Sequence, residues 1–419
     1  MMFTEVFEGK NPGFDIVIGN PPYVESRSSS VDEHQKKAIQ QQLRIRHSKE
    51  DADCFPRGAD LLIFFFELSF NIASSTGINT FITENSWLST DYGSKFQQFI
   101  LKNVNSLGII DSDYKYFDDA DINTVITFFE NKGLRVVDTI PFVHCHGDLS
   151  KHSYQIQHPN SDDTISVKLF KRNDDILTKH KWGFLFSIDD RLLRLLEDIS
   201  KKENKSLRRK IDIGQGLNLT KDCILTHEVA NSSPYYISDN GPLYRWTKPS
   251  HYVNNEKATS TRRKPILILP RGIGTHFCCM NEVDGFSASY VEIYEKEPLS
   301  SDDKLRIWLF CNSSLFWVLR EVTGRCNLGG GMLKAEATDM KRIPLCFDFK
   351  DITEIRNIYN QCLSEKVPTN IDEAISSEIH KKIDDIVYRY FELGNDCFVT
   401  ELLLERFKWR TTKSKNKKK

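Results

Sequence analysis

The sequence predicts an α/β fold in which a strand-and-helix sheet is followed by a β-rich α+β region and closing helices. Apolar strand-like runs alternate with helical patterns over residues 14–129. Short β-like runs then occupy 211–343, and isoleucines at helical spacing dominate 371–393. We therefore expect four segments: a sheet domain over 1–135, a connector with one helix over 136–200, a β-rich domain over 201–350, and C-terminal helices with a basic tail over 351–419.

The sheet domain opens with the run Phe14-Asp15-Ile16-Val17-Ile18, which is closed by Gly19. Such a β-branched run is typical of a buried strand in a parallel sheet. Further strands and helices are expected in alternation, which favours parallel strands joined by crossover helices. The expected strands cover 78–83, 107–111 and 125–129, and the expected helices cover 32–46, 60–72 and 96–103.

The later elements follow from shorter patterns. An S-x-x-D start signal at Ser187 precedes apolar residues at helical spacing, which predicts a helix to Ile199. Short strands are expected at 211–213, 235–237, 266–269 and 290–294, interrupted by a helix over 305–321. An amphipathic helix is expected over 371–393.

The composition is that of a globular protein. Of the 419 residues, 39% are hydrophobic, and no apolar run approaches the roughly 18 residues that span a membrane. The ten cysteines form no C-x-x-C pair and the sequence shows no signal peptide, which together predict reduced thiols and a cytoplasmic location. The lack of a long apolar run leads us to expect no membrane partner. The tripeptide His144-Cys145-His146 lacks a second ligand pair at finger-like spacing, so we interpret it as a polar connector and expect no metal.

Charge is distributed unevenly along the chain. Residues 1–150 hold 13 Lys and Arg against 21 Asp and Glu, a difference of −8, whereas residues 201–275 hold 14 against 6, a difference of +8. A basic segment in which cations stand beside aromatics suits a polyanion such as nucleic acid. The cations expected to contact DNA are Arg245, Lys248, Arg262, Arg263, Lys264, Arg271, Arg325 and Lys334.

The stretch Gly19-Asn20-Pro21-Pro22-Tyr23 carries the clearest chemistry. Two prolines stiffen the loop after the strand and remove two backbone donors. Asn20 Oδ1 and the Pro21 carbonyl can each accept a hydrogen of a planar amino group, and Tyr23 can stack on the attached ring. These acceptors would draw electron density toward the nitrogen, so that its lone pair can attack a sulfonium methyl. Phe117 is either a second aromatic wall of this pocket or an ordinary core anchor.

The run at 13–23 resembles the catalytic motif of the N6-adenine DNA methyltransferases of restriction-modification systems, in the TaqI-like N-P-P-Y group. Later segments are similar to further motifs of that family in the same order: 59–66, 81–88, 117–127, 325–344 and 383–388. The resemblance implies a Rossmann-like methyltransferase sheet, double-stranded DNA as substrate, S-adenosylmethionine as methyl donor, and a DNA target-recognition domain over 201–350.

The same resemblance assigns roles to the loop. It implies that Asn20 and the Pro21 carbonyl hold the amino group of an adenine flipped out of the duplex. Tyr23 would stack on that base and Phe117 would contact its other side. Pro22 would lie near the methyl donor.

The sequence departs from the family at the donor-binding loop. In the family, an aromatic-x-G-x-G loop precedes N-P-P-Y, whereas only thirteen residues precede Phe14 here. We therefore expect the C-terminal half of a methyltransferase sheet, from a longer or split methylase whose partner chain supplies the donor-binding half. Gly214-Gln215-Gly216 is a weak alternative donor loop. Two other functions stay open: a DNA-binding remnant or specificity subunit that needs a partner for catalysis, and a protein glutamine-amide methyltransferase.

Overall fold

The computed structural model divides the chain into two compact units. Residues up to 188 build the first unit, and 189–328 with 332–411 build the second. We treat each unit by itself. The structure describes residues 3–23, 33–114, 116–117, 123–131, 136–151, 164–188, 190–255, 263–328, 332–345, 347–394 and 398–415.

The first unit is built on a mixed sheet with the strand order β1-β2-β4-β3-β5-β6. Its strands are β1 (Phe14–Gly19), β2 (Ala73–Glu84), β3 (Val104–Ser112), β4 (Thr124–Asn131), β5 (Thr139–Cys145) and β6 (Ile165–Lys171). The pairs β1–β2 and β3–β5 are parallel. Strand β4 is antiparallel to both of its neighbours, and β6 is antiparallel to β5.

The expectation of a wholly parallel sheet was therefore wrong. Strand β4 follows β3 in the chain without a helix between them in the described residues, and parallel neighbours need a long crossover. A short connection instead returns the chain in the opposite direction. Strands β5 and β6 come from the segment predicted to be a connector, yet they belong to the same sheet as β1.

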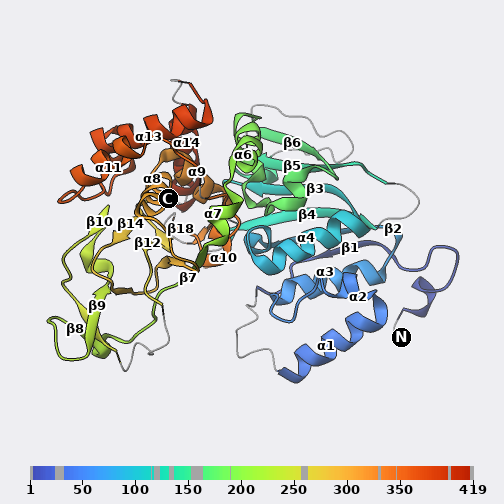
Figure 1. The fold of residues 1–419 in the computed structure, drawn as a ribbon. Helices are drawn as coiled ribbons and strands as arrows, with labels where there is room; N and C mark the ends of the chain where they lie inside the picture. Colours follow the sequence, from blue (N-terminus) through green and yellow to red (C-terminus); the bar gives the residue numbers. More distant parts are fainter. Residues whose placement is uncertain are drawn as a thin grey trace. The chain divides into compact units, whose positions relative to one another are not determined.

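Two helices of the first unit, α3 (Leu61–Ile72) and α4 (Asp91–Asn103), pack on one face of this sheet through an aromatic core. The ring of Phe66 lies 5.1 Å from that of Phe81, 5.1 Å from that of Phe96 and 5.7 Å from that of Phe129. Figure 1 shows α3 and α4 lying against the strands. The helices are α1 (Glu33–Arg46), α2 (Lys49–Ala52), α3 (Leu61–Ile72), α4 (Asp91–Asn103) and α5 (Asp175–Lys179). The helices predicted over 32–46, 60–72 and 96–103 are thus confirmed.

The described residues of the second unit form three small sheets. A five-stranded sheet has the order β10-β14-β12-β16-β7, a four-stranded sheet the order β15-β9-β11-β8, and a three-stranded sheet the order β13-β18-β17. The strands are β7 (Ile211–Gln215), β8 (Ile224–Leu225), β9 (Ser232–Tyr236), β10 (Arg245–Trp246), β11 (Tyr252–Asn254), β12 (Leu267–Leu269), β13 (Gly272–Ile273), β14 (Cys279–Asn281), β15 (Phe286–Ser287), β16 (Val291–Glu295), β17 (Arg325–Leu328) and β18 (Met332–Lys334). The prediction of a β-rich segment here is confirmed.

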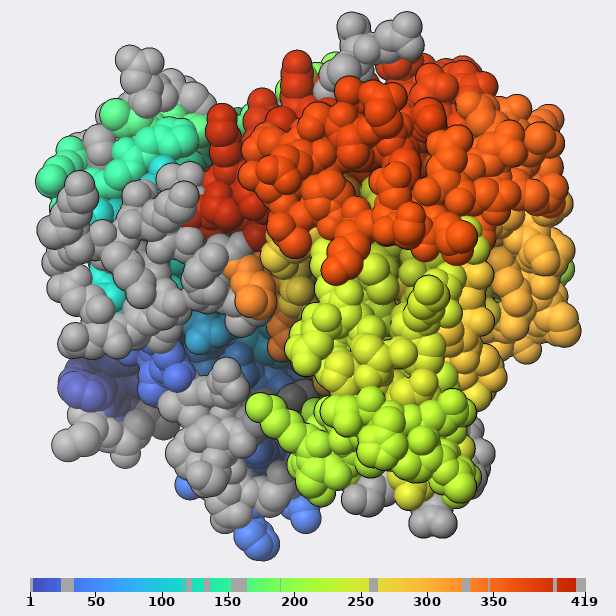
Figure 2. All heavy atoms as spheres, turned by 90° about the vertical axis from the view of Figure 1, so that its left-hand side faces the viewer, coloured from blue at the N-terminus to red at the C-terminus, as the bar shows by residue number. Residues whose placement is uncertain are grey.

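Helices of the second unit precede, interrupt and follow these strands. They are α6 (Asp190–Lys202), α7 (Lys205–Arg209), α8 (Ser301–Cys311), α9 (Ser314–Thr323), α10 (Ala337–Met340), α11 (Ile352–Gln361), α12 (Ile371–Ser376), α13 (Glu378–Phe391) and α14 (Phe398–Lys415). In Figure 2 the orange-red segment of α11 to α13 lies against the yellow-green segment before β11, where the Val367 amide donates to the Pro242 carbonyl at 3.0 Å. Within the described part of the chain, no helix is long and apolar enough to cross a membrane.

Two helices predicted as continuous are each broken by a serine. The helix expected over 305–321 divides into α8 and α9 because Ser313 Oγ accepts a hydrogen bond from the Phe316 amide at 3.2 Å. The helix expected over 371–393 divides into α12 and α13 at Ser377, which accepts from the His380 amide at 3.3 Å. A serine side chain that satisfies the first amides of a helix starts a new helix, even where apolar spacing continues through it.

Candidate active site at the end of strand β1

The predicted pocket residues lie at the carboxyl end of β1, beside β2. Gly19 pairs with Phe81, and a Cβ on Gly19 would lie 3.1 Å from the Phe81 ring, so a glycine lets the strand end pack closely there. Pro21 is buried and anchors the loop, whereas Asn20 is exposed. The Asn20 amide is therefore held at the end of a sheet strand and can be reached by a ligand.

Tyr23 and Phe117 are brought together, although they are far apart in the sequence. Their ring centroids lie 5.7 Å apart and the rings meet edge to face. The Tyr23 hydroxyl donates a long hydrogen bond to the Ile82 carbonyl at 3.5 Å. Burial, with a smaller contribution from the charge of Glu84, raises the pKa of Tyr23 to about 12. Tyr23 is consequently a neutral aromatic ring at physiological pH.

Sequence reasoning missed polar groups at the end of β2 and at the start of α3. Glu84 ends β2, the neighbour of β1, and its charge acts on Tyr23. The Tyr92 hydroxyl donates to Asp60 at the start of α3 and lies 3.0 Å from Ser86 Oγ. A sequence pattern could have indicated Glu84 and Asp60: an acidic residue lies at the end of an apolar strand or directly before an apolar helix. The carboxyl ends of strands and the starts of helices meet at this edge of a sheet.

The weak donor-loop candidate has a packing explanation. Gly214 lies on β7, antiparallel to β16. A Cβ on Gly216 would lie 2.5 Å from the Ser287 carbonyl oxygen, and a Cβ on Gly214 would lie 2.8 Å from the Tyr294 ring. Both glycines therefore allow close approach within the β-rich unit, and the next described elements after β7 are a short 3₁₀ turn and strands.

Most of the cations predicted to contact DNA are paired with acids of the second unit. Arg245 forms two hydrogen bonds with Glu282, at 2.6 and 3.0 Å, and lies over the Tyr359 ring at 4.1 Å. These contacts favour a structural role for Arg245. Ion pairs also join the predicted cations Arg263 to Asp212 (2.8 Å), Lys264 to Asp284 (2.8 Å), Arg271 to Glu336 (2.7 Å) and Lys334 to Glu336 (3.0 Å).

The small sheet β13-β18-β17 gathers three of these cations. Lys334 pairs with Gly272, next to Arg271, on one side and with Arg325 on the other. Although burial opposes its ionisation, Arg271 and Lys334 hold the pKa of Glu336 below its usual range. Lys248 is exposed in the same unit. Arg262 and the glycines at 329–331 lie outside the described residues.

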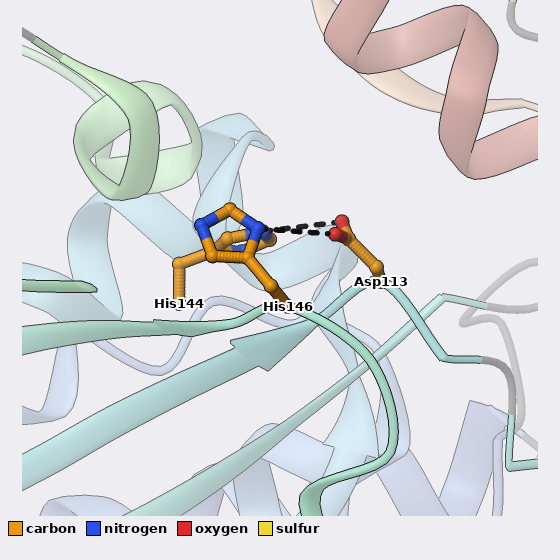
Figure 3. Close-up of side chains that lie close together, drawn as sticks. All are labelled: Asp113, His144 and His146. Atoms are coloured by element: carbon orange, nitrogen blue, oxygen red, sulfur yellow. Dashed lines mark hydrogen bonds and ion pairs between the residues drawn. The ribbon is translucent and has the colours of Figure 1, made fainter. Parts of the chain in front are cut away.

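A second polar cluster lies at the same edge of the first sheet. Asp113 follows β3, and it lies beside His144 and His146 at the end of β5 (Figure 3). The sequence led us to expect a polar connector without metal at these histidines. In the structure His144 is buried on a sheet strand, and a carboxylate 33 residues before His146 in the chain completes a group with metal-ligand chemistry.

Comparison with known proteins adds a family match to this geometry. Residues 1–117 match the family model described as Eco57I restriction-modification methylase. The type IIL restriction-modification enzyme MmeI, solved in complex with DNA, is 12% identical with a TM-score of 0.53, over 95% of this chain and 57% of that one. The type IIG restriction endonuclease BpuSI is 12% identical with a TM-score of 0.36, over 95% of this chain and 55% of that one.

The likeness to MmeI is one of fold. The chain spans little more than half the length of either solved enzyme. The methylase match covers the segment that holds Asn20, Tyr23 and Phe117, which is the segment whose geometry is described above.

Proposed function

We propose that the chain is part of a site-specific DNA methyltransferase that transfers a methyl group from S-adenosylmethionine to N6 of adenine in a cytoplasmic restriction-modification system. One observation carries the proposal. The loop Gly19-Asn20-Pro21-Pro22-Tyr23 presents an exposed amide at the end of β1, with Tyr23 facing Phe117, inside the segment that matches the methylase family model.

The chemistry assigned to these residues is limited to binding and polarisation. An adenine flipped out of its duplex would place its amino group between Asn20 Oδ1 and the Pro21 carbonyl, which accept its two hydrogens. Tyr23 and Phe117 would hold the ring by aromatic contact. The donor supplies an electrophilic methyl group, and the amino lone pair attacks it while the leaving sulfur takes the bonding electrons. The proton lost from nitrogen passes to solvent or to a nearby base such as Glu84.

Donor binding calls for more protein than the loop. Pro22 is exposed and has no backbone N–H, so it can offer the donor its ring and a carbonyl acceptor but no hydrogen-bond donor. Ile16 and Ile18 on β1 are 64% and 79% exposed, on the face opposite Phe81 and α3. We propose that a donor-binding half, in a longer chain or on a partner chain, pairs its strands with the edge of β1 and packs over these two side chains, because exposed apolar edges are usually covered.

The test is a labelled-methyl transfer assay. The chain is incubated with S-adenosylmethionine and duplex DNA, alone and with a candidate partner chain, and modified nucleosides are identified by mass spectrometry. We expect N6-methyladenine in at least one condition. Replacing Asn20 by Ala should lower the rate by about a hundredfold or more, as for other polar groups that act at the reacting atom. Asn173→Ala, at an exposed turn of the same unit, is the matched control.

Three outcomes would contradict the proposal. Absence of label under both conditions would leave a DNA-binding or specificity protein without catalysis. Label in a glutamine-containing peptide instead of DNA would indicate the amide methyltransferase alternative. Equal methyl-transfer rates for Asn20→Ala and Asn173→Ala would show that the Asn20 side chain takes no part in the reaction.

A further inference from the structure

We propose that Asp113, His144 and His146 form a binding site for a divalent transition-metal ion, best suited to zinc, which fastens the segment that carries Phe117 to strand β5. This site goes beyond methyl transfer and takes no part in its chemistry. Figure 3 shows the Asp113 carboxylate directed at the two imidazoles.

Sheet pairing creates the cluster. Strands β3 and β5 are parallel, with Asp111 opposite His144. Alternation along β5 puts His144 and His146 on one face and buries Cys145 on the other. Asp113 comes just after β3, where its amide donates to the Cys145 carbonyl at 3.1 Å. The backbone therefore holds all three donor groups at the carboxyl ends of two adjacent strands.

The distances fit a tetrahedral ion. His144 Nε2 lies 3.1 Å from Asp113 Oδ1, and His146 Nδ1 lies 3.3 Å from Asp113 Oδ2. The candidate ligand atoms all lie within 4.8 Å of one another. In a zinc site with bonds of about 2.0 to 2.1 Å, neighbouring ligand atoms are about 3.3 Å apart. Small side-chain rotations would bring the three groups onto one ion.

The contacts of His144 are also compatible with a metal ligand. His144 Nδ1 lies 3.2 Å from Asp111 Oδ2, while its Nε2 faces Asp113. A neutral imidazole has one N–H and can donate to only one of these carboxylates. When Nδ1 donates to Asp111, the lone pair of Nε2 faces an oxygen of Asp113. A metal ion between these two atoms would bind both of them. A carboxylate that orients a ligating histidine in this way is common in metal sites.

The exposure of the side chains indicates where an ion would enter, and the ligand types indicate which metal would bind. The side chains of Asp111 and His144 are 3% and 6% exposed, whereas that of His146 is 56% exposed. The ion would thus enter from the His146 side. Two imidazoles and one carboxylate suit zinc and related divalent ions, whereas magnesium and calcium prefer oxygen ligands. Three protein ligands leave one position for water.

The site lies away from the base-binding loop but is connected to it. Strands β1 and β5 are four strand spacings apart in the sheet, roughly 19 Å, and their carboxyl ends share one edge. Asp113 begins the chain segment that reaches Phe117. Ser112 Oγ donates to the Gly147 carbonyl at 2.6 Å, and the Leu149 amide donates to the Tyr116 hydroxyl at 2.9 Å. A metal would add a stronger link at the same place.

The test measures zinc binding by the full chain after treatment with a chelator. We expect one zinc ion per chain by calorimetry, unaffected by excess magnesium, and the visible absorption of four-coordinate cobalt when cobalt replaces zinc. His146→Ala and Asp113→Asn should weaken zinc binding by more than tenfold. Asp111→Asn, which leaves the ligands in place, should weaken it by about 10- to 100-fold. His227→Ala, an exposed histidine of the other unit, is the matched control.

The outcomes separate a metal site from a network of hydrogen bonds. If the wild type binds no zinc, or if His146→Ala and His227→Ala bind it equally, the metal site is refuted and the four side chains form an ion-pair network only. Hydrogen exchange at residues 113–117 should slow when zinc is added. Unchanged exchange with zinc bound would refute the fastening role. None of these readouts depends on methyl transfer.

Discussion

At the scale of single residues, the surroundings of Tyr23 fit the proposed role of its ring in binding a flat base. Its hydroxyl has only a long hydrogen bond to Ile82, whereas its ring has a defined edge-to-face contact with Phe117. Because its pKa is raised to about 12, the hydroxyl does not titrate near neutral pH. We therefore assign the proposed base contact to the ring of Tyr23 rather than to its hydroxyl.

This distinction predicts different effects for two substitutions of Tyr23. Tyr23→Phe keeps the ring and should retain methyl transfer with an unchanged pH profile between pH 7 and 9. Tyr23→Ala removes a stacking contact of roughly 1 to 3 kcal/mol and should lower kcat/KM for DNA by about 5- to 150-fold. Steady-state kinetics of the complete methylating system would measure both. A comparable loss in the two variants would assign the role to the hydroxyl instead.

At the scale of elements, a buried carboxylate joins helices of the second unit. Glu321 on α9 is fully buried, and both its oxygens lie near Arg410 Nε on α14, at 3.1 and 2.9 Å. His276 Nε2 lies 2.8 Å from Glu321 Oε1, and burial, above all, lowers the pKa of His276 to about 4. The histidine is thus neutral and donates to Glu321, and Arg410 supplies the opposite charge.

Removing that charge should loosen the attachment of α14. Glu321→Gln leaves the Arg410 guanidinium buried without its counter-charge, which costs about 3 to 5 kcal/mol of unfolding free energy. Urea unfolding of the full chain would measure the loss, with the exposed Glu228→Gln as control.

The same carboxylate contributes to acid sensitivity. Burial opposes the ionisation of Glu321, but His276 and Arg410 lower its pKa below the usual value. Its contribution is therefore present above the ordinary carboxyl pKa and is lost as the pH falls through the lowered value. The Glu321→Gln variant should lack this part of the pH dependence of stability. An equal acid dependence in the two proteins would show that the charge of Glu321 does not stabilise the fold.

At the scale of the whole molecule, the local charge of a segment differs from the charge that the folded unit presents. The excess of +8 over residues 201–275 predicts a basic surface. In the fold, acids from later in the chain, including Glu282, Asp284 and Glu336, pair with several of these cations. The field available to a DNA backbone is consequently weaker than the segment count indicates, and exposed lysines such as Lys248 become more important.

Salt dependence of DNA binding would reveal these contributions. Lys248→Ala should weaken binding to duplexes of any sequence and lower the slope of log K against log salt by about 0.9 if Lys248 neutralises one phosphate. Fluorescence anisotropy at several salt concentrations would measure the slope. Lys350→Ala, another exposed lysine of the second unit, should leave it unchanged. Identical slopes for wild type and Lys248→Ala would exclude a phosphate contact at Lys248.

The sequence alone determined the features that depend on local periodicity and turn chemistry. The extent of the strand before Gly19 and the helices over 33–46 and 61–72 were predictable because neighbouring residues decide them. The expected burial of that strand was wrong, because β1 lies at the edge of the sheet and leaves Ile16 and Ile18 exposed. The same reasoning failed where a local polar group competes with apolar spacing, as at Ser313 and Ser377, which begin new helices.

Only the tertiary structure decided which distant residues meet. The antiparallel insertion of β4, the contact of Tyr23 with Phe117, and the pairing of Arg271 with Glu336 all depend on how the strands pair. The cluster of Asp113 with His144 and His146 depends on the parallel pairing of β3 with β5. Strand pairing is a long-range choice that no local pattern encodes, so a histidine pair that looks like a polar connector in the sequence becomes a candidate metal site in the fold.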